Sequence, residues 1–222
     1  MNTELKIRTF VVNQLQENCY VVSDDTGEAV IIDCGAYYDS ERDAIVNHLR
    51  DNHLTLRHLL LTHGQFDHAF GIDTIFKEFG VRPEIHEADR MLVEDIDAQF
   101  RSMMGITYRH DSVAVEHCLA DGDIVSFGNH QLRVVHTPGH SRGGVVLWCE
   151  AAKVAFTGDT IFRMSVGRTD LGGGSWQQLM ESLKKMASML PDDTVLYPGH
   201  GPITTMGEEK CFNPYLSSAF TK

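Results

Sequence analysis

The sequence predicts an α/β fold in which mixed β-sheets are covered by helices. Short apolar runs of strand length alternate with segments of helical period along the 222 residues. Several of these runs stop at a glycine or proline and are followed by a histidine or aspartate. No linker or low-complexity stretch divides the chain, so we expect a single domain over residues 1–222.

The first half of the chain is expected to supply four strands and three helices. The strands, which share alternation or short apolar runs, are predicted at residues 7–12, 19–22, 29–32 and 57–61. A helix is predicted over residues 40–51, because the hydroxyl of Ser40 can cap it and apolar residues recur near one face. Further helices are predicted over residues 69–79 and 88–103.

The second half is expected to supply five strands and one long helix. The strands are predicted at residues 124–127, 131–136, 145–148, 153–156 and 194–197. The helix is predicted over residues 176–189 and is stopped by Pro191. The glycines at 172–174 are expected to form a loop near the functional site rather than a hinge, since a helix follows at once.

A cluster of metal-capable side chains follows the apolar run at residues 59–61. His63, Asp67 and His68 fall within one tight turn, with the amide of Gln65 between them. Packing gives no reason for two imidazoles and a carboxylate here, whereas both are usual ligands of a divalent metal. With 12 histidines in the chain, this motif alone is a weak signal.

Three further strand-like runs end in the same way. They lead to His140, Asp159 and His200, each next to a glycine or proline. Because ligands of α/β proteins gather outside the carboxyl ends of strands, these side chains are expected to meet in one site.

These six residues, in this order, resemble the ligand set of the metallo-β-lactamase superfamily. Shorter motifs resemble its short glyoxalase II-like (hydroxyacylglutathione hydrolase-like) branch, and they lie at residues 18–20, 31–33, 137–141, 156–160, 165–170, 197–202 and 208–216. The resemblance implies a four-layer αββα sandwich of two mixed β-sheets flanked by helices, with a metal site at the open edge between the sheets.

The resemblance also implies a role for each ligand. Metal site one would take His63, residue 65 and His140, and site two would take Asp67, His68 and His200. Asp159 would bridge both sites, and Asp67 and Asp159 are the expected catalytic residues. Zinc is the first expectation for one or two bound ions, with iron or manganese as alternatives. Members that hydrolyse β-lactams often have Cys where Asp159 stands, so the pattern points away from antibiotic hydrolysis.

Gln65 departs from the family pattern, which has His at this position. An amide oxygen is a poorer zinc ligand than imidazole. Three outcomes stay open: Gln65 ligates weakly, site one is empty, or the metal is kept only for structure.

Other residues near the motifs have two interpretations each. Asp33 ends a strand and could orient a ligand histidine or cap a turn. Arg168 could clamp an anionic substrate group or brace its loop through Asp170. His136 is expected at the surface or behind the ligands, and Cys34 is expected to be a buried, inert thiol.

The expected function is hydrolysis of a thioester or ester by a metal-bound hydroxide, of the glyoxalase II type. Only 22 residues follow His200, so we do not expect the helical region that holds glutathione in full-length glyoxalase II enzymes. The alternatives are a mononuclear iron dioxygenase acting on a persulfide, and a metal-binding protein with weak activity.

Composition restricts the partners. The net charge of −12 argues against nucleic acid and against anionic membrane surfaces, so a small-molecule substrate is expected. The polar start and the five scattered cysteines without a C-x-x-C pair favour a cytoplasmic protein with reduced thiols. Oligomeric state is not predicted.

Overall fold

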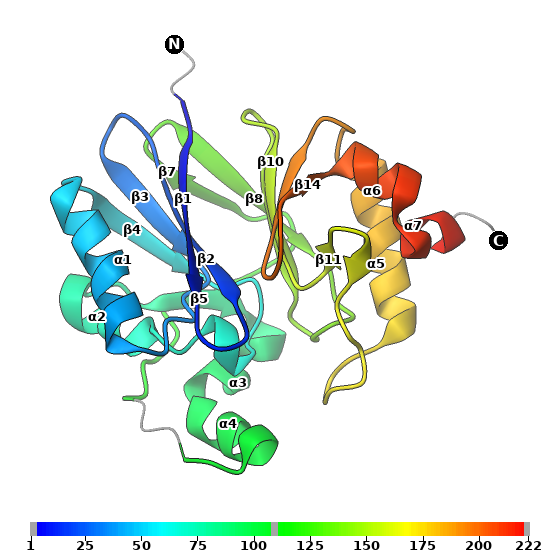
Figure 1. Ribbon diagram of the computed structural model, residues 1–222. Helices are drawn as coiled ribbons and strands as arrows, with labels where there is room; N and C mark the ends of the chain where they lie inside the picture. Colours follow the sequence, from blue (N-terminus) through cyan, green and yellow to red (C-terminus); the bar gives the residue numbers. More distant parts are fainter. Residues whose placement is uncertain (1–3, 108–110, 220–222) are drawn as a thin grey trace.

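Two six-stranded sheets form the centre of the computed structural model, which describes residues 4–107 and 111–219 (Figure 1). The first sheet consists, in spatial order, of β1 (Lys6–Val12), β2 (Glu17–Ser23), β3 (Glu28–Ile32), β4 (Thr55–Leu60), β5 (Pro83–His86) and β6 (His117–Leu119). The second consists of β14 (Thr204–Thr205), β13 (Val195–Pro198), β10 (Val154–Gly158), β9 (Val145–Cys149), β8 (His130–His136) and β7 (Ile124–Phe127).

Both sheets are mixed, as the sequence predicts. In the first, β1, β2 and β3 are antiparallel neighbours, whereas β3 to β6 run parallel. In the second, β10 and β13 are parallel and the other pairs are antiparallel. The parallel strands of both sheets end near one edge of the sandwich, and that edge carries the candidate site.

Alternation along the strands separates three apolar cores. In β2, Tyr20 and Val22 face the space between the sheets, and Cys19 and Val21 face the helices outside the first sheet. The second sheet is built in the same way: Val134 lies between the sheets, and Val135 packs outward with residues of the neighbouring helix. Strands buried on both faces explain why the sequence shows short continuous apolar runs.

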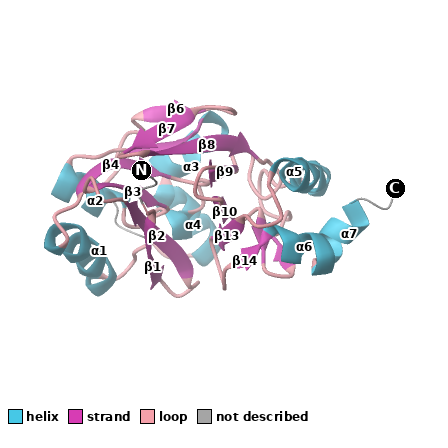
Figure 2. Cartoon of the chain, turned by 90° about the horizontal axis from the view of Figure 1, so that it is seen from above, coloured by secondary structure: helices cyan, strands magenta, loops and turns pink. Residues whose placement is uncertain are grey.

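Helices cover both outer faces, which completes the four layers seen from above in Figure 2. On the first sheet lie α1 (Asp39–Asp51) and α2 (Ile72–Phe79), followed by α3 (Arg90–Glu94) and α4 (Ile96–Met104). On the second lie α5 (Trp176–Met189), α6 (Met206–Phe212) and α7 (Pro214–Ala219). The predicted αββα sandwich is confirmed.

Some elements differ from the prediction. The prediction of a single helix over residues 88–103 is wrong. A 3-10 turn, η2 (Glu87–Asp89), leads into α3, and the helical conformation is interrupted at Asp95 (φ −133°, ψ 56°). Asp95 then caps α4 by accepting a hydrogen bond from the backbone N–H of Ala98. The helix predicted over 69–79 begins only at Ile72, because the short 3-10 turn η1 (Phe66–His68) precedes it.

A small two-stranded sheet, β11 (Ile161–Phe162) and β12 (Ser165–Val166), forms a hairpin beside α7. Buried polar side chains of the C-terminal helices brace it: Glu209 accepts from the backbone N–H of Met164, and Asn213 donates to the carbonyl of Ser165. The position of this hairpin therefore depends on residues far along the chain.

No helix in the described part of the chain is long and apolar enough to cross a bilayer. The five cysteines are free thiols, and Cys34 is buried, as expected.

Candidate metal centre

The predicted metal-ligating side chains converge at the edge of the sandwich from four strand ends. His63 follows β4, and Asp67 and His68 lie in η1. His140, Asp159 and His200 follow β8, β10 and β13, respectively. Segments from both sheets, up to 137 residues apart in sequence, thus supply one cluster.

Two glycines allow these loops to approach one another. A Cβ atom on Gly199 would lie 2.4 Å from Oδ1 of Asp159 and 2.6 Å from Cε1 of His68. Gly158 has φ +48°, and a Cβ there would meet Thr62 at 2.3 Å. Any larger residue at either position would push the ligand loops apart.

The cluster divides into two groups, each with its ligand atoms within 4.8 Å of one another: His63, His140 and Asp159, and then Asp67, His68 and His200. Asp159 lies between them. Its Oδ1 is 3.4 Å from Nε2 of His68, and its Oδ2 is 3.6 Å from Nε2 of His140 and 3.7 Å from Nε2 of His200. Asp67 Oδ2 is 3.3 Å from Nε2 of His200. The carboxylate of Asp159 therefore stands where a bridging ligand would stand.

All four histidines present Nε2 to the cluster, because the opposite ring nitrogen is held by an oxygen. The Nδ1 contacts are His63 to Thr62 Oγ1 at 3.1 Å, His68 to Asp33 Oδ2 at 3.0 Å, His140 to the Arg168 carbonyl at 2.8 Å and His200 to the Leu15 carbonyl at 3.0 Å. In a neutral imidazole, such contacts favour the tautomer with the proton on Nδ1, which leaves the lone pair of Nε2 directed inward for a metal.

The ring nitrogens and carboxylate oxygen that face the centre of the cluster lack the hydrogen-bond partners that buried polar atoms normally have. Nε2 of His63, His68 and His140 and Oδ1 of Asp159 are buried and make no hydrogen bond within the described residues. Neutral imidazole nitrogens and carboxylate oxygens are the donor set that zinc and iron take in proteins. The residues present therefore fit a divalent metal.

The electrostatics of the cluster balance positive and negative groups. Burial alone would lower the pKa of His68, but the carboxylates of Asp33, Asp159 and Asp67 raise that pKa well above its ordinary value. Burial and the neighbouring His68 and His140 instead lower the pKa of His63. Against the opposing effect of burial, His68 and the other histidines hold the pKa of Asp159 well below its usual range, so this carboxylate stays ionised.

Asp33 contacts the predicted ligand His68, which is the geometry that one of its two predicted roles requires. It has a left-handed backbone (φ +55°), lies buried behind His68 and also accepts hydrogen bonds from the N–H and hydroxyl of Thr62. One carboxylate thus fixes His68 directly and His63 through the Thr62 hydroxyl.

Three other predicted residues lie in or near the site, and each has a different position. Gln65 lines the cavity at the cluster, its side chain does not cap the turn that follows it, and its ligation stays a prediction. Arg168 also lines this cavity, and its guanidinium pairs with both carboxylate oxygens of Asp170 at 2.7 Å. His136 lies outside both ligand groups: it contacts the carbonyl of Arg142 at 3.0 Å and stacks on His86.

Sequence reasoning missed two side chains that hold the ligand loops. Buried Asp89 accepts hydrogen bonds from the backbone N–H of Gly64 at 3.0 Å and of Gly143 at 2.7 Å, so it joins the loop of His63 to the loop of His140. Gln99 of α4 accepts from the N–H of Phe66 and donates to the carbonyl of Gly64. Neither residue belongs to a motif, so only their spatial position reveals them.

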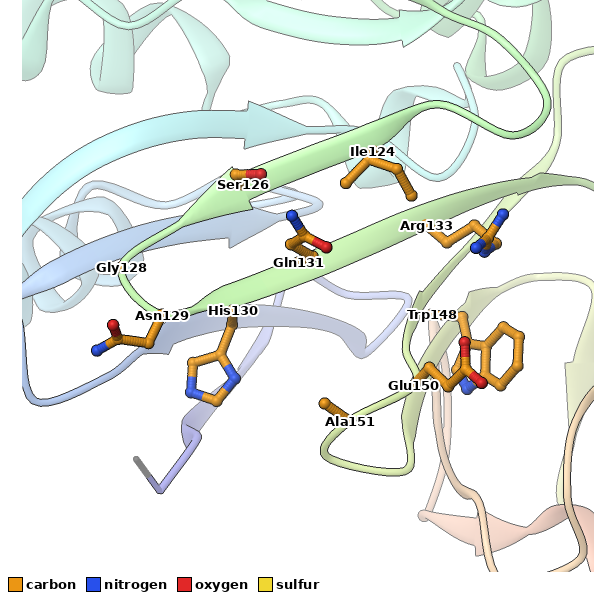
Figure 3. A pocket seen from close by; sticks show the side chains of 10 residues that line it. All are labelled: Ile124, Ser126, Gly128, Asn129, His130, Gln131, Arg133, Trp148, Glu150 and Ala151. Atoms are coloured by element: carbon orange, nitrogen blue, oxygen red, sulfur yellow. The ribbon is translucent and has the colours of Figure 1, made fainter. Parts of the chain in front are cut away.

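A cavity of about 400 Å³ opens above the cluster. Its lining residues are Leu15, Gln65, Phe66, Asp67, Met103, His140, Asp159, Phe162, Val166, Arg168, Leu171 and His200. A larger hollow of about 580 Å³ lies on the outer face of β7, β8 and β9, where Gln131, Arg133 and Trp148 help to line it (Figure 3). None of the predicted site residues lines that hollow, so the smaller cavity is the candidate site.

Comparison with known proteins matches the sequence of this chain to one family. A family model described as the Metallo-beta-lactamase superfamily matches residues 12–200. The uncharacterized protein ML0493 of Mycobacterium leprae (strain TN) is 39% identical over 217 residues, which cover 95% of this chain and 98% of the relative. Hydroxyacylglutathione hydrolase GloC of Haemophilus influenzae is 33% identical over 217 residues, which cover 96% of this chain and 99% of the relative.

Two solved structures are similar over nearly the whole chain. The BLEG-1 B3 metallo-beta-lactamase superposes with a TM-score of 0.87 at 34% identity, covering 96% of this chain and all 100% of that one. TTHA1623 in a di-iron-bound form superposes with a TM-score of 0.83 at 34% identity, covering 94% of this chain and 100% of the TTHA1623 chain.

Proposed function

This chain belongs to the metallo-β-lactamase superfamily, and from that premise we propose that it is a metal-dependent hydrolase of acyl thioesters or esters. The observation that carries the proposal is the convergence of four Nε2 atoms, each with its Nδ1 held by an oxygen, around the carboxylate of Asp159. The name of the GloC relative, a hydroxyacylglutathione hydrolase, supports the thioester class.

Two groups of side chains would hold the metal. His63, His140 and Asp159, with Gln65 as a weak fourth ligand, would form one site, and Asp67, His68 and His200, with Asp159 shared, would form the other. A divalent metal bound there supplies Lewis acidity, which lowers the pKa of water and polarises a carbonyl group. Zinc is the first candidate, and the di-iron form of TTHA1623 supports iron as the alternative.

The chain's own residues favour water as the nucleophile. None of the described residues that line the cavity is a serine, threonine, cysteine or lysine, so none could form the usual acyl-enzyme. Asp67 lines the cavity beside His200 and is placed to take the proton that the attacking water loses. The ionised carboxylate of Asp159 would offset the positive charge of the metal bound between the histidines.

Thioester hydrolysis with defined metals tests the proposal. The protein would be stripped with a chelator, reloaded with zinc, iron or manganese, and assayed for thiol release from the butyryl thioester of N-acetylcysteamine. We expect activity to disappear on stripping and to return with at least one metal. Thiol release that is equally fast without metal would contradict the proposal.

Parallel assays separate the alternatives. Oxygen consumption with a persulfide and an iron-loaded protein would instead indicate the dioxygenase. Ring opening of a chromogenic cephalosporin, the reaction class in the name of BLEG-1, would indicate a β-lactamase.

A further inference from the structure

The walls of the cavity above the ligand cluster are apolar on both sides. Leu15, Phe66 and Met103 line it from the first half of the chain, and Phe162, Val166 and Leu171 line it from the second half. Leu15 lies in the turn between β1 and β2, Met103 in α4, and Phe162 in the hairpin beside α7. Three separately held segments therefore present apolar side chains to the same space.

Two of these apolar side chains, those of Leu15 and Met103, are exposed to solvent. Leu15 is 50% exposed and Met103 is 45% exposed, and the stretch after Met103 continues with Met104 and Ile106, which are 49% and 59% exposed. An exposed apolar surface that borders a candidate active site is typical of a ligand-binding surface. An apolar ligand would remove this surface from water.

Away from the metal cluster, the described side chains that line the cavity offer no unpaired lysine or arginine to an anionic group. Arg168 is the one lysine or arginine among its described lining residues, and its guanidinium already makes two hydrogen bonds of 2.7 Å to the carboxylate of Asp170. The other charged groups of the lining, Asp67 and Asp159, are carboxylates of the metal cluster. A carboxylate at the far end of an acyl chain, away from the metal cluster, would therefore lose hydration without gaining a partner.

We propose that the acyl part of the substrate is an uncharged, apolar chain of several carbon atoms. This inference rests on the proposed hydrolase function: the carbonyl group would lie at the cluster, and the chain would extend between Leu15, Met103 and Phe162. Hydrophobic contact would supply the affinity, and the missing free cation would exclude acyl groups with a terminal carboxylate.

Binding of the free acids tests the inference without turnover. Titration calorimetry of the metal-loaded protein would compare acetate, butyrate, hexanoate and succinate. Each methylene buried in an apolar site strengthens binding roughly two- to fourfold, so we expect hexanoate to bind on the order of tenfold or more tightly than acetate. Butyrate should bind more tightly than succinate, which has the same number of carbon atoms and a second carboxylate.

Three variants test whether the chain-length and charge preferences arise in the cavity. Met103→Ala should reduce the hexanoate-to-acetate ratio by about threefold or more. Met104→Ala is the control, because Met104 has nearly the same exposure on the same helix but does not line the cavity. Asp170→Asn frees Arg168 and should narrow the difference between butyrate and succinate.

The possible outcomes distinguish this inference from the hydrolase proposal. Equal binding of acetate and hexanoate, or tighter binding of succinate than butyrate, would overturn the apolar acyl site even in an active thioesterase. Chain-length-dependent binding by a protein that hydrolyses no thioester would support the acyl site and contradict the hydrolase.

Discussion

Oδ2 of Asp33 lies 3.0 Å from Nδ1 of His68, and both side chains are almost completely buried. This contact fixes the ring of His68 so that Nε2 points at Asp159. Asp33 directly follows β3 and contacts His68, 35 residues further along the chain, so the first sheet itself positions a predicted metal ligand.

The first prediction concerns this contact. Asp33→Ala should weaken metal binding about 10- to 100-fold, the usual effect of losing a carboxylate that orients a ligand histidine. Asp33→Asn keeps the shape of the side chain and an acceptor oxygen, so it should weaken metal binding less than Asp33→Ala does. Metal titration of both variants checks this, and wild-type affinity in Asp33→Ala would show that His68 needs no such support.

The second prediction concerns Asp89, which joins two ligand loops. Asp89→Ala leaves the N–H groups of Gly64 and Gly143 without their acceptor, at a cost of about 2 kcal/mol in the free energy of unfolding. Because these loops carry His63 and His140, the variant should lose metal from this group before it loses the other ion. Denaturant titration and metal analysis measure the two effects, and Asp95→Ala, which removes only a helix cap, is the control. If Asp89→Ala loses no more metal than that control, Asp89 has no part in holding the site.

Gln65 gives the third prediction. If its amide is a weak ligand, one ion should bind tightly and one loosely, and Gln65→His should tighten the loose one because imidazole replaces the amide. Titration calorimetry with zinc measures both affinities. Two equally tight sites in the wild-type protein would argue against a loose first site.

The fourth prediction follows from the raised pKa of His68. Although burial opposes the charge, Asp33, Asp159 and Asp67 raise the pKa of this imidazole, so the metal-free protein holds the His68 proton more tightly than a free imidazole would. A metal needs the neutral ring, so metal binding at pH 7 should release a proton, and affinity should rise as pH increases toward the raised pKa. Calorimetry in buffers of different ionisation enthalpy counts the proton. Asp33→Asn should release fewer protons, and no release in the wild-type protein would contradict this assignment.

Much of the fold was predictable because its strands are buried on both faces. Runs such as residues 29–32 and 154–156 are apolar for that reason, and such runs predict strands from the sequence alone. The strands β11, β12 and β14 have two residues each, too few for any period to appear. The helix break at Asp95 was not visible either, since the capping interaction there overrides an otherwise helical pattern.

The candidate site was predictable to the extent that its residues end strands. His63, His140, Asp159 and His200 each follow a strand, so the topology brings them together. Asp89 and Gln99 have no such position in the sequence pattern, and their roles arise from the packing of η2 and α4 against the ligand loop. The pairing of Arg168 with Asp170 was one of two alternatives, and only the side-chain geometry shows it.

Asp159→Ala provides the most direct test of the metal-dependent hydrolase. Metal content and thioester hydrolysis would be measured together in the wild-type protein, in this variant and in Asp193→Ala, which removes an exposed carboxylate paired with Lys153. Since Asp159 faces both ligand groups, we expect the variant to lose bound metal and hydrolysis together, while Asp193→Ala keeps both. Wild-type metal content and activity in Asp159→Ala would contradict the account.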